Sequence, residues 1–401
     1  MTWPSQPITY LGKTCGRAPL KRFGIKQADR LSHLYAIGKT GTGKSTLLQQ
    51  MIMQDIEAGR GCCLIDPHGD LVERIASNIP AYRKADLTYL NVPKVHQVPE
   101  VIGYNPLRYV RADKRSLAAS GVLEVFKKMW GDSWGVRMEH ILRNSILTLL
   151  EIPGSNLSDI LRLYSDETFR KQCVAKLQNT QVKYFWEREY AKWSYPFRLN
   201  AIAPIQNKVG AFLADPNVRR ILIEPDEDIS FRQIMDERKI LLVNLSKGQI
   251  GEDAASLLGG LLVTTIGLAS YSRADVAEQK RTPFHLYMDE FQNFTTLSVA
   301  NMISELRKFK VALVLATQFL SSLKPEVRDA VMGNCGTLIF FRLGAHDAAY
   351  IAKELAPTFT AEDIVHLPNY HIYLKLMIDG APSRPFSAQT LPSILNVDHT
   401  Q

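Results

Sequence analysis

The sequence predicts an α/β fold in which a mainly parallel, doubly wound sheet is interrupted by an inserted all-helical domain. Three observations lead to this prediction. Short apolar runs of strand length alternate with segments of helical spacing in both the first and the last part of the chain. One such run, at residues 34–37, leads into a glycine-rich loop and a helical segment. Between residues 111 and 215 strand patterns disappear and helical patterns follow one another.

The glycine-rich loop reads Gly-Lys-Thr-Gly-Thr-Gly-Lys-Ser over residues 38–45 and fits the pattern G-x-x-x-x-G-K-[ST]. Backbone N–H groups of such a loop, and the start of the following helix, bind a polyphosphate. Lys44 is expected to reach the β- and γ-phosphates, and the Ser45 hydroxyl to bind Mg²⁺. The expected nucleotide-binding residues are Gly38, Lys39, Thr40, Gly41, Thr42, Gly43, Lys44, Ser45 and Thr46.

Composition narrows the class of protein further. With 401 residues, 46% of them hydrophobic and 22% charged, the chain has the make-up of a soluble globular protein of two or three units. The net charge of +8 favours an anionic partner without identifying one. Five cysteines without zinc-ligand spacing favour a reducing, cytoplasmic compartment. No secretory signal opens the sequence, and the uncharged stretch 254–270 is too rich in small residues for a membrane span, so a buried helix is expected there.

The remaining strands follow the same pattern of short, continuous apolar runs. After the loop, strands are expected at 61–66 and 87–92, the first ending in the polar turn Asp-Pro-His-Gly-Asp. Later strands are expected at 239–245, 284–290, 311–316 and 337–342. We therefore expect residues 1–110 and 216–401 to form the two parts of one α/β domain, with residues 111–215 as the helical insertion.

Within the insertion, helices are expected at 115–129, 137–150, 156–164, 167–179 and 182–193. Breaks such as Pro153-Gly154 and Tyr195-Pro196 separate these segments. An aromatic cluster lies in the insertion, for which packing in a helical core is favoured over stacking on bases. Its members are Trp130, Trp134, Phe185, Trp186, Trp193 and Phe197.

Two adjacent carboxylates, Asp289 and Glu290, end the apolar strand at 284–290. The carboxyl ends of strands form the edge where open α/β sheets bind ligands. Asp289 is expected to hold Mg²⁺, directly or through water, and Glu290 to act as the general base toward the attacking water.

Three further polar side chains are candidates for the catalytic site. Gln318 follows the strand at 311–316 and is expected to meet the γ-phosphate, with helix capping as the alternative. Arg307 lies near the end of the preceding helix, and Arg342 ends the strand at 337–342. Either arginine is a candidate for an arginine finger that contacts the ATP of a neighbouring subunit. The alternative is an ordinary surface salt bridge.

Taken together, these residues resemble the TraG/TraD-type coupling ATPases of conjugative type IV secretion, within the FtsK/HerA class of P-loop DNA translocases. The resemblance covers nearly the whole chain, from about Ile8 to Pro392. It is based on the loop at 38–45, the turn at 66–70, Asn-Pro-Leu at 105–107, Asp-Glu-Phe-Gln at 289–292, Arg307, Thr317 with Gln318, and the segment 336–342.

The resemblance implies a RecA-like ATPase domain, ATP with Mg²⁺, and a hexameric ring that passes DNA through its centre with little regard to sequence. It also implies that Arg307 acts in trans as the finger and that Gln318 acts as a sensor. Relaxase or secretion-channel proteins are the protein partners it implies. Membrane-anchored members carry N-terminal transmembrane helices, whereas no such segment is expected here, so attachment would be peripheral, at the inner face of the membrane.

Two alternatives to a conjugative DNA translocase remain open. One is a soluble DNA-processing pump of the HerA type. The other is a nucleotide-gated adaptor that recruits protein substrates, with hydrolysis secondary. Stimulation of the ATPase by DNA distinguishes both kinds of pump from the adaptor.

Overall fold

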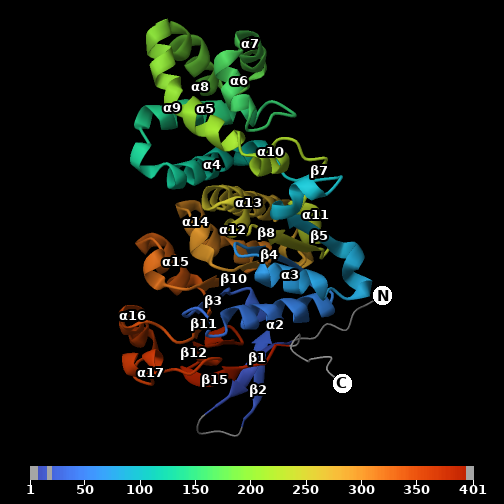
Figure 1. Ribbon diagram of the computed structural model, residues 1–401, viewed down its shortest axis with the longest axis vertical. Helices are drawn as coiled ribbons and strands as arrows, with labels where there is room; N and C mark the ends of the chain where they lie inside the picture. Colours follow the sequence, from blue (N-terminus) through green and yellow to red (C-terminus); the bar gives the residue numbers. More distant parts are fainter. Residues whose placement is uncertain (1–7, 16–19, 394–401) are drawn as a thin grey trace. The chain divides into compact units, whose positions relative to one another are not determined.

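The computed structural model describes residues 8–15 and 20–393, which form two compact units (Figure 1). The first unit comprises the described parts of Met1–Leu90, Arg232–Leu245 and Arg273–Gln401. The second comprises Asn91–Phe231 and Ser246–Ser272. The predicted insertion at 111–215 lies inside the second unit, which extends beyond it on both sides and also takes in a distant helix, α13 (Glu252–Ser272).

Close packing of small residues explains why α13 joins the helical unit. It packs against α4 (Arg115–Met129), and a Cβ added to Gly260 would lie 3.1 Å from Val125. A Cβ added to Gly121, on α4, would likewise lie 2.5 Å from Thr264. The two helices therefore approach more closely than larger residues would allow. This pairing across more than a hundred residues is not visible in the spacing of either segment.

The first unit is built on an 11-stranded sheet. In spatial order its strands are β2 (Arg22–Lys26), β1 (Ile8–Thr14), β15 (Phe386–Thr390), β12 (His371–Lys375), β11 (Thr337–Phe340), β3 (Leu34–Ile37), β10 (Val311–Thr317), β9 (Phe284–Met288), β4 (Gly61–Asp66), β8 (Ile240–Asn244) and β5 (Leu87–Asn91). From β11 to β8 the neighbours are parallel, which confirms the predicted doubly wound sheet. From β11 to β2 they are antiparallel.

Helices cover the sheet of the first unit on its faces and edges (Figure 1). Those within the unit or at its boundary are α1 (Gln27–Arg30), α2 (Lys44–Glu57), α3 (Asp70–Ser77), α11 (Phe231–Asp236), α14 (Leu297–Glu305), α15 (Pro325–Asn334), α16 (Ala345–Leu355) and α17 (Ala361–Val365). On one face, α2 and α3 pack against each other and against β4.

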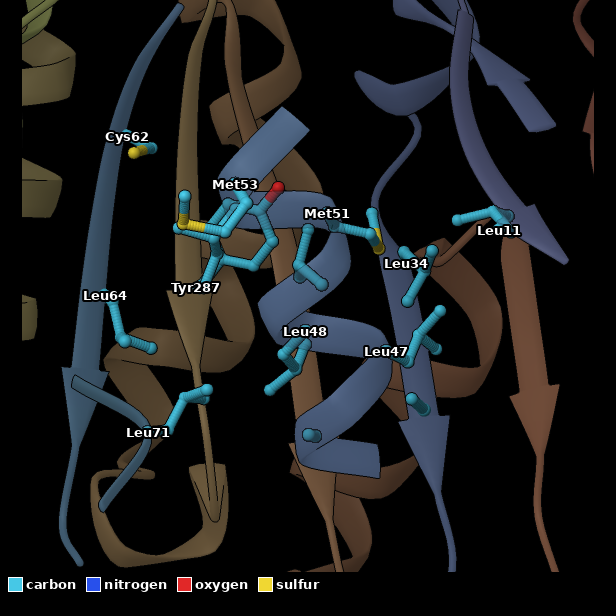
Figure 2. Packing of buried hydrophobic residues seen from close by; sticks show 14 of the residues in the cluster. Leu11, Leu34, Leu47, Leu48, Met51, Met53, Cys62, Leu64, Leu71 and Tyr287 are labelled. Carbon is cyan, nitrogen blue, oxygen red and sulfur yellow. The ribbon is translucent and has the colours of Figure 1, made fainter. Parts of the chain in front are cut away.

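The core between α2 and the sheet is built mainly from apolar side chains (Figure 2). Leu47, Leu48 and Met51 of α2 are completely buried against strand residues such as Leu34 and Leu64. Because side chains alternate along a strand, Tyr35 and Ile37 of β3 point to the opposite face, and they too are buried. Burial on both faces explains why these strands appear in the sequence as continuous apolar runs.

The second unit is mostly helical. Besides α4 and α13 it contains α5 (Val136–Leu149), α6 (Asp159–Ser165), α7 (Glu167–Lys176), α8 (Thr180–Tyr184), α9 (Tyr195–Leu213), α10 (Pro216–Leu222) and α12 (Lys247–Ile250), with a two-stranded pair of β6 (Ile102–Gly103) and β7 (Glu227–Asp228). Phe185 and Trp186 are buried and contact each other edge to face. These two residues of the aromatic cluster therefore lie in the helical core.

One stretch of the described helices, Glu252–Asp275, is long and apolar enough to span a membrane by length and composition. It contains α13, and 83% of its apolar window is buried inside the structure. Its burial matches the expectation of a core helix at 254–270.

Candidate active site

The glycine-rich loop joins the end of β3 to the start of α2. Gly41 and Gly43 have φ values of 75° and 119°, which side chains other than glycine adopt only with strain. No side chain caps α2, whose helical residues begin at Lys44. The N–H groups of its first turn are therefore available to an anion. This is the conformation expected of a phosphate-binding loop.

Lys44 is buried within the loop, with 5% of its surface exposed. Its Nζ donates to the carbonyl oxygens of Gly38 at 2.5 Å and Lys39 at 3.3 Å. Burial lowers the pKa of Lys44, while the nearby carboxylates of Glu290 and Asp289 act in the opposite direction. The ammonium group thus lies between the loop and the two predicted acidic residues.

Asp289 and Glu290 follow β9, next to the loop. The Ser45 hydroxyl donates to Asp289 Oδ2 at 3.4 Å, and Asp289 is 5% exposed. Burial raises the pKa of Asp289 to about 7, and the charges of Asp66 and Glu290 add to the effect. A buried carboxylate that resists ionisation beside two other carboxylates is a site where a cation is strongly favoured.

The residues present fit a magnesium ion at this position. Mg²⁺ in nucleotide sites is held by one or two protein oxygens together with phosphate oxygens and water. Ser45 Oγ and Asp289 Oδ2 are two such oxygens, brought together from separate elements. Among the described residues, no cluster of three or more His, Cys, Asp or Glu side chains is arranged to bind a metal by itself.

Asp66, which lies close enough to raise the pKa of Asp289, has a structural role of its own. Its carboxylate accepts from the N–H groups of His68 at 2.8 Å, and of Leu71 and Val72 at 3.0 Å each. It therefore caps the start of α3 and shapes the turn at 66–70.

Glu290 adopts a left-handed conformation, with φ 44° and ψ 50°. Non-glycine residues adopt this conformation rarely. Where they do, the residue often belongs to a functional site. Gln292 Nε2 donates to Glu290 Oε2 at 2.6 Å and restrains the carboxylate. Gln292 belongs to the segment 289–292 that carries the resemblance, but its contact with Glu290 is not evident from the sequence.

Gln318 lies beside the loop, as predicted. Its Nε2 donates to the Thr40 hydroxyl. The preceding residue, Thr317, accepts from the N–H of Gly38 at 3.2 Å, so the end of β10 is joined directly to the loop. The amide therefore lies against the phosphate-binding loop.

The two candidate arginines lie at opposite ends of the parallel strands: Arg307 precedes β10, and Arg342 follows β11. The carbonyl oxygen of Arg342 accepts from Lys39 N–H at 3.0 Å, so Arg342 flanks the loop of its own subunit. Arg307 lies before β10, whose seven residues separate it from Thr317 by roughly 20 Å at 3.3 Å per residue. It is exposed, and close enough to His33, at the start of β3, to lower its pKa. Arg307 therefore cannot reach its own loop.

Tyr370 is a neighbour of the loop that the sequence analysis did not identify. Its N–H donates to the Thr42 carbonyl at 2.8 Å, and a Cβ added to Gly43 would lie 2.8 Å from its ring. The only sequence signal is the Pro-Asn turn just before it. Antiparallel pairing of β12, a strand not predicted, brings this residue to the loop.

The chain is similar to known proteins in part of its sequence and in its fold. Residues 283–364 match the family model described as the TraM recognition site of TraD and TraG. The chain is similar to the bacterial conjugative coupling protein TrwBdeltaN70, with a TM-score of 0.63 and 16% identity, over 95% of this chain and 88% of that one. It is similar to VirB4 of Thermoanaerobacter pseudethanolicus, with a TM-score of 0.64 and 12% identity, over 98% of each chain. No curated protein matches the chain.

A further similar structure is TrwB in complex with ADP and Mg²⁺, with a TM-score of 0.62 and 16% identity, over 92% of this chain and 86% of that one. The fold is thus that of a RecA-like P-loop NTPase. The family match and these structures confirm the resemblance to TraG/TraD-type coupling ATPases. At these identities the structural likeness concerns the fold, so the roles of individual residues depend on the geometry described above.

Proposed function

We propose that this chain is the ATPase of a conjugative or type IV secretion-like DNA transfer system, and that it couples ATP hydrolysis to movement of DNA. The observation that carries the proposal is the meeting of Lys44, Asp289 and Gln318 at one edge of the sheet. TrwB, which shares the fold, has been solved with ADP and Mg²⁺ and with non-hydrolysable analogues of GTP and ATP.

In the proposed reaction, the loop N–H groups and Lys44 bind and orient the phosphates. Ser45 and Asp289 would hold Mg²⁺, which neutralises charge developing on the phosphate oxygens. Glu290, restrained by Gln292, accepts a proton from the attacking water. Gln318, on the side of the loop formed by Thr40, responds to the presence of the γ-phosphate.

The position of Arg307 supports assembly into a ring. An arginine that cannot reach its own loop can act on a phosphate only across an interface between subunits. Fingers of this kind contribute about 10³–10⁵ to the rate in well-studied nucleotide hydrolases. Arg342, which flanks the loop of its own subunit, is better suited to contact phosphate in cis.

ATPase rates with and without DNA, combined with sizing of the protein with and without nucleotide, test this proposal. DNA is expected to raise the rate, and nucleotide to favour a ring. DNA affinity is expected to fall by about 0.9 log units per log unit of salt for each phosphate neutralised, with little dependence on sequence. A rate indifferent to DNA, or an affinity indifferent to salt, would contradict the coupling.

A second candidate is the nucleotide-gated adaptor. It is favoured by one observation, the match of residues 283–364 to a segment described as a recognition site for another protein. In this case nucleotide binding would control docking of an accessory or relaxase protein. Nucleotide-dependent capture of such a partner, with an ATPase that ignores DNA, would support the adaptor over the pump.

A further inference from the structure

A cavity of about 320 Å³ lies beside the phosphate-binding loop, and none of the reaction steps above uses it. Thr46, the residue after Ser45, forms part of its wall. The other walls come from the antiparallel side of the sheet and from the segment after it, through Lys13, Tyr370, Gln389 and Leu391. The cavity thus begins one residue beyond the predicted magnesium ligand.

The outer wall of the cavity is held by defined contacts to α2. Gln49 Nε2 donates to Ser393 Oγ at 3.2 Å, and the Gln50 side chain donates to the Pro392 carbonyl. Leu391 N–H donates to the Leu11 carbonyl at 3.4 Å. The helix that begins at the phosphate-binding loop therefore also fixes this wall.

Tyr370 presents an aromatic ring between the loop and the cavity. Its side chain is 46% exposed, although its backbone is fixed on both sides: its N–H donates to Thr42 and its carbonyl accepts from Thr390 N–H at 2.9 Å. Its φ of 64° is a left-handed conformation that tyrosine rarely adopts. A large aromatic ring held rigidly in this way can stack on a planar ligand at little cost in entropy.

Two polar side chains lie side by side in the cavity wall. Lys13 and Gln389 are paired directly between β1 and β15, and both are exposed. Within residues 8–15 and 20–393, neither side chain forms a hydrogen bond or ion pair with another residue. An ammonium group offers donors only, whereas an amide offers both donors and an acceptor. Together they match the mixed donors and acceptors on the edge of a nucleobase.

We propose that this cavity binds the base of the nucleotide whose phosphates occupy the loop, with Tyr370 stacking on the base and with Lys13 and Gln389 contacting its edge. The inference rests on the proposed nucleotide-binding function. It adds a base-recognition site formed by the C-terminal strands, far in sequence from the loop.

Titration calorimetry with two probes tests the proposal. ATP carries the base, whereas inorganic tripolyphosphate offers phosphates alone. Tyr370→Ala is expected to weaken ATP binding about tenfold or more, in the range measured for loss of base stacking, and to leave tripolyphosphate binding unchanged. Tyr370→Phe, which keeps the ring, is expected to bind both probes as the parent does.

Tyr109→Ala is the matched control, because Tyr109 is also an exposed tyrosine at positive φ (61°) but belongs to the second unit. It is expected to bind both probes normally. Gln389→Ala is expected to alter the preference between ATP and GTP without changing tripolyphosphate binding.

The outcomes separate this inference from the proposed function. If the parent protein binds ATP and tripolyphosphate with equal affinity, or if Tyr370→Ala weakens both probes equally, the base site is refuted while phosphate binding stands. If the parent binds neither probe, the nucleotide-binding function fails as well.

Discussion

Glu290 is the residue on which the proposed hydrolysis depends most directly. Glu290→Gln keeps the shape of the side chain but removes its ability to take a proton from water. We expect the variant to bind ATP as the parent does and to lose turnover by about 10²–10⁴-fold, the usual contribution of a general base. Steady-state ATPase rates together with nucleotide affinity measure both quantities.

Lys44→Ala serves as the contrasting variant, because it removes the positive charge on the phosphates themselves. It is expected to lose hydrolysis together with much of its nucleotide affinity. A Glu290→Gln variant that hydrolyses ATP at the parental rate would show that another group accepts the proton.

His33 makes stability depend on pH. It is 2% exposed, its Nδ1 accepts from Leu313 N–H at 3.0 Å, and burial, reinforced by Arg307, lowers its pKa from 6.5 to about 4. Between these values the unfolded chain binds the proton and the folded chain does not, so the free energy of unfolding falls as pH falls. The full effect is about 3 kcal/mol, present above pH 6.5 and lost by about pH 4.

The contribution of His33 is isolated by comparison with His33→Asn, since asparagine tolerates the φ of 62° at this position. Buried His285, with its pKa lowered to about 3, acts in the same direction, whereas Asp289, with its pKa raised to about 7, acts in the opposite one. Urea unfolding at pH 5 and pH 7 should show a smaller loss of stability on acidification in the variant. Equal losses in parent and variant would contradict the assignment.

At the level of single residues, the sequence predicts the part of the site that is contiguous along the chain. The loop at 38–45 and the Asp289-Glu290 pair can each be identified from the sequence. Both are local motifs: the loop follows one apolar strand, and the acidic pair ends another. Tyr370 cannot, since its contact with Thr42 joins positions more than three hundred residues apart. Their meeting depends on strand pairing that no local pattern specifies.

Among the elements, α1, α2 and β9 are joined by a buried ion pair. Arg30 donates to both carboxylate oxygens of Asp55, at 2.5 and 2.8 Å, and to the Tyr287 hydroxyl at 2.6 Å. Arg30 is 2% exposed and Asp55 is completely buried. The guanidinium holds the pKa of Asp55 far below its usual range, although burial by itself would raise it.

Asp55→Ala is expected to destabilise the first unit by about 3–5 kcal/mol, because it leaves the Arg30 charge buried without its partner. Glu167→Ala provides the comparison, since the Glu167–Lys171 pair on α7 is exposed and such pairs contribute little. Denaturant unfolding of both variants gives the measurement. An Asp55→Ala variant as stable as the parent would mean that water or another group compensates the charge.

The strands differ in how well the sequence predicts them, and burial explains the difference. β3, β4, β8, β9, β10 and β11 are covered on both faces and appear as continuous apolar runs, so their positions are predicted. β12 and β15 are covered less evenly: β12 (His371–Lys375) alternates between buried and half-buried residues. In so short a segment such alternation is a weak signal. The antiparallel side of the sheet, and with it the proposed base site, was therefore not predicted.

For the whole molecule, the assignment of Arg307 can be tested by mixing subunits. Arg307→Ala should bind ATP about as well as the parent and lose most hydrolysis, because Lys44 and the loop remain intact. Lys44→Ala should also be inactive by itself. A mixed ring contains interfaces that combine an intact loop with an intact arginine, so partial activity is expected to return on mixing, as measured by ATPase titration across ratios.

If mixed rings form and no ratio restores activity, Arg307 does not act in trans, and Arg342 is tested in the same way. Arg342→Ala mixed with Lys44→Ala is expected to stay inactive, because Arg342 lies beside the loop of its own subunit. The two mixtures therefore distinguish an arginine shared between subunits from one that serves its own site.

The separation of Arg307 from its own loop, along the full length of β10, also restricts the symmetry of any assembly. If Arg307 acts in trans as proposed, each subunit has one surface that receives an arginine and another that supplies one. A two-fold dimer, in which the same patch meets itself, cannot match these surfaces without bringing both into one patch. Head-to-tail association matches them without that requirement, and such contacts either close into a ring or continue as a filament. The rotation between neighbouring subunits therefore decides the outcome. In a closed ring every loop receives an arginine, whereas in an open filament the loop at one end does not.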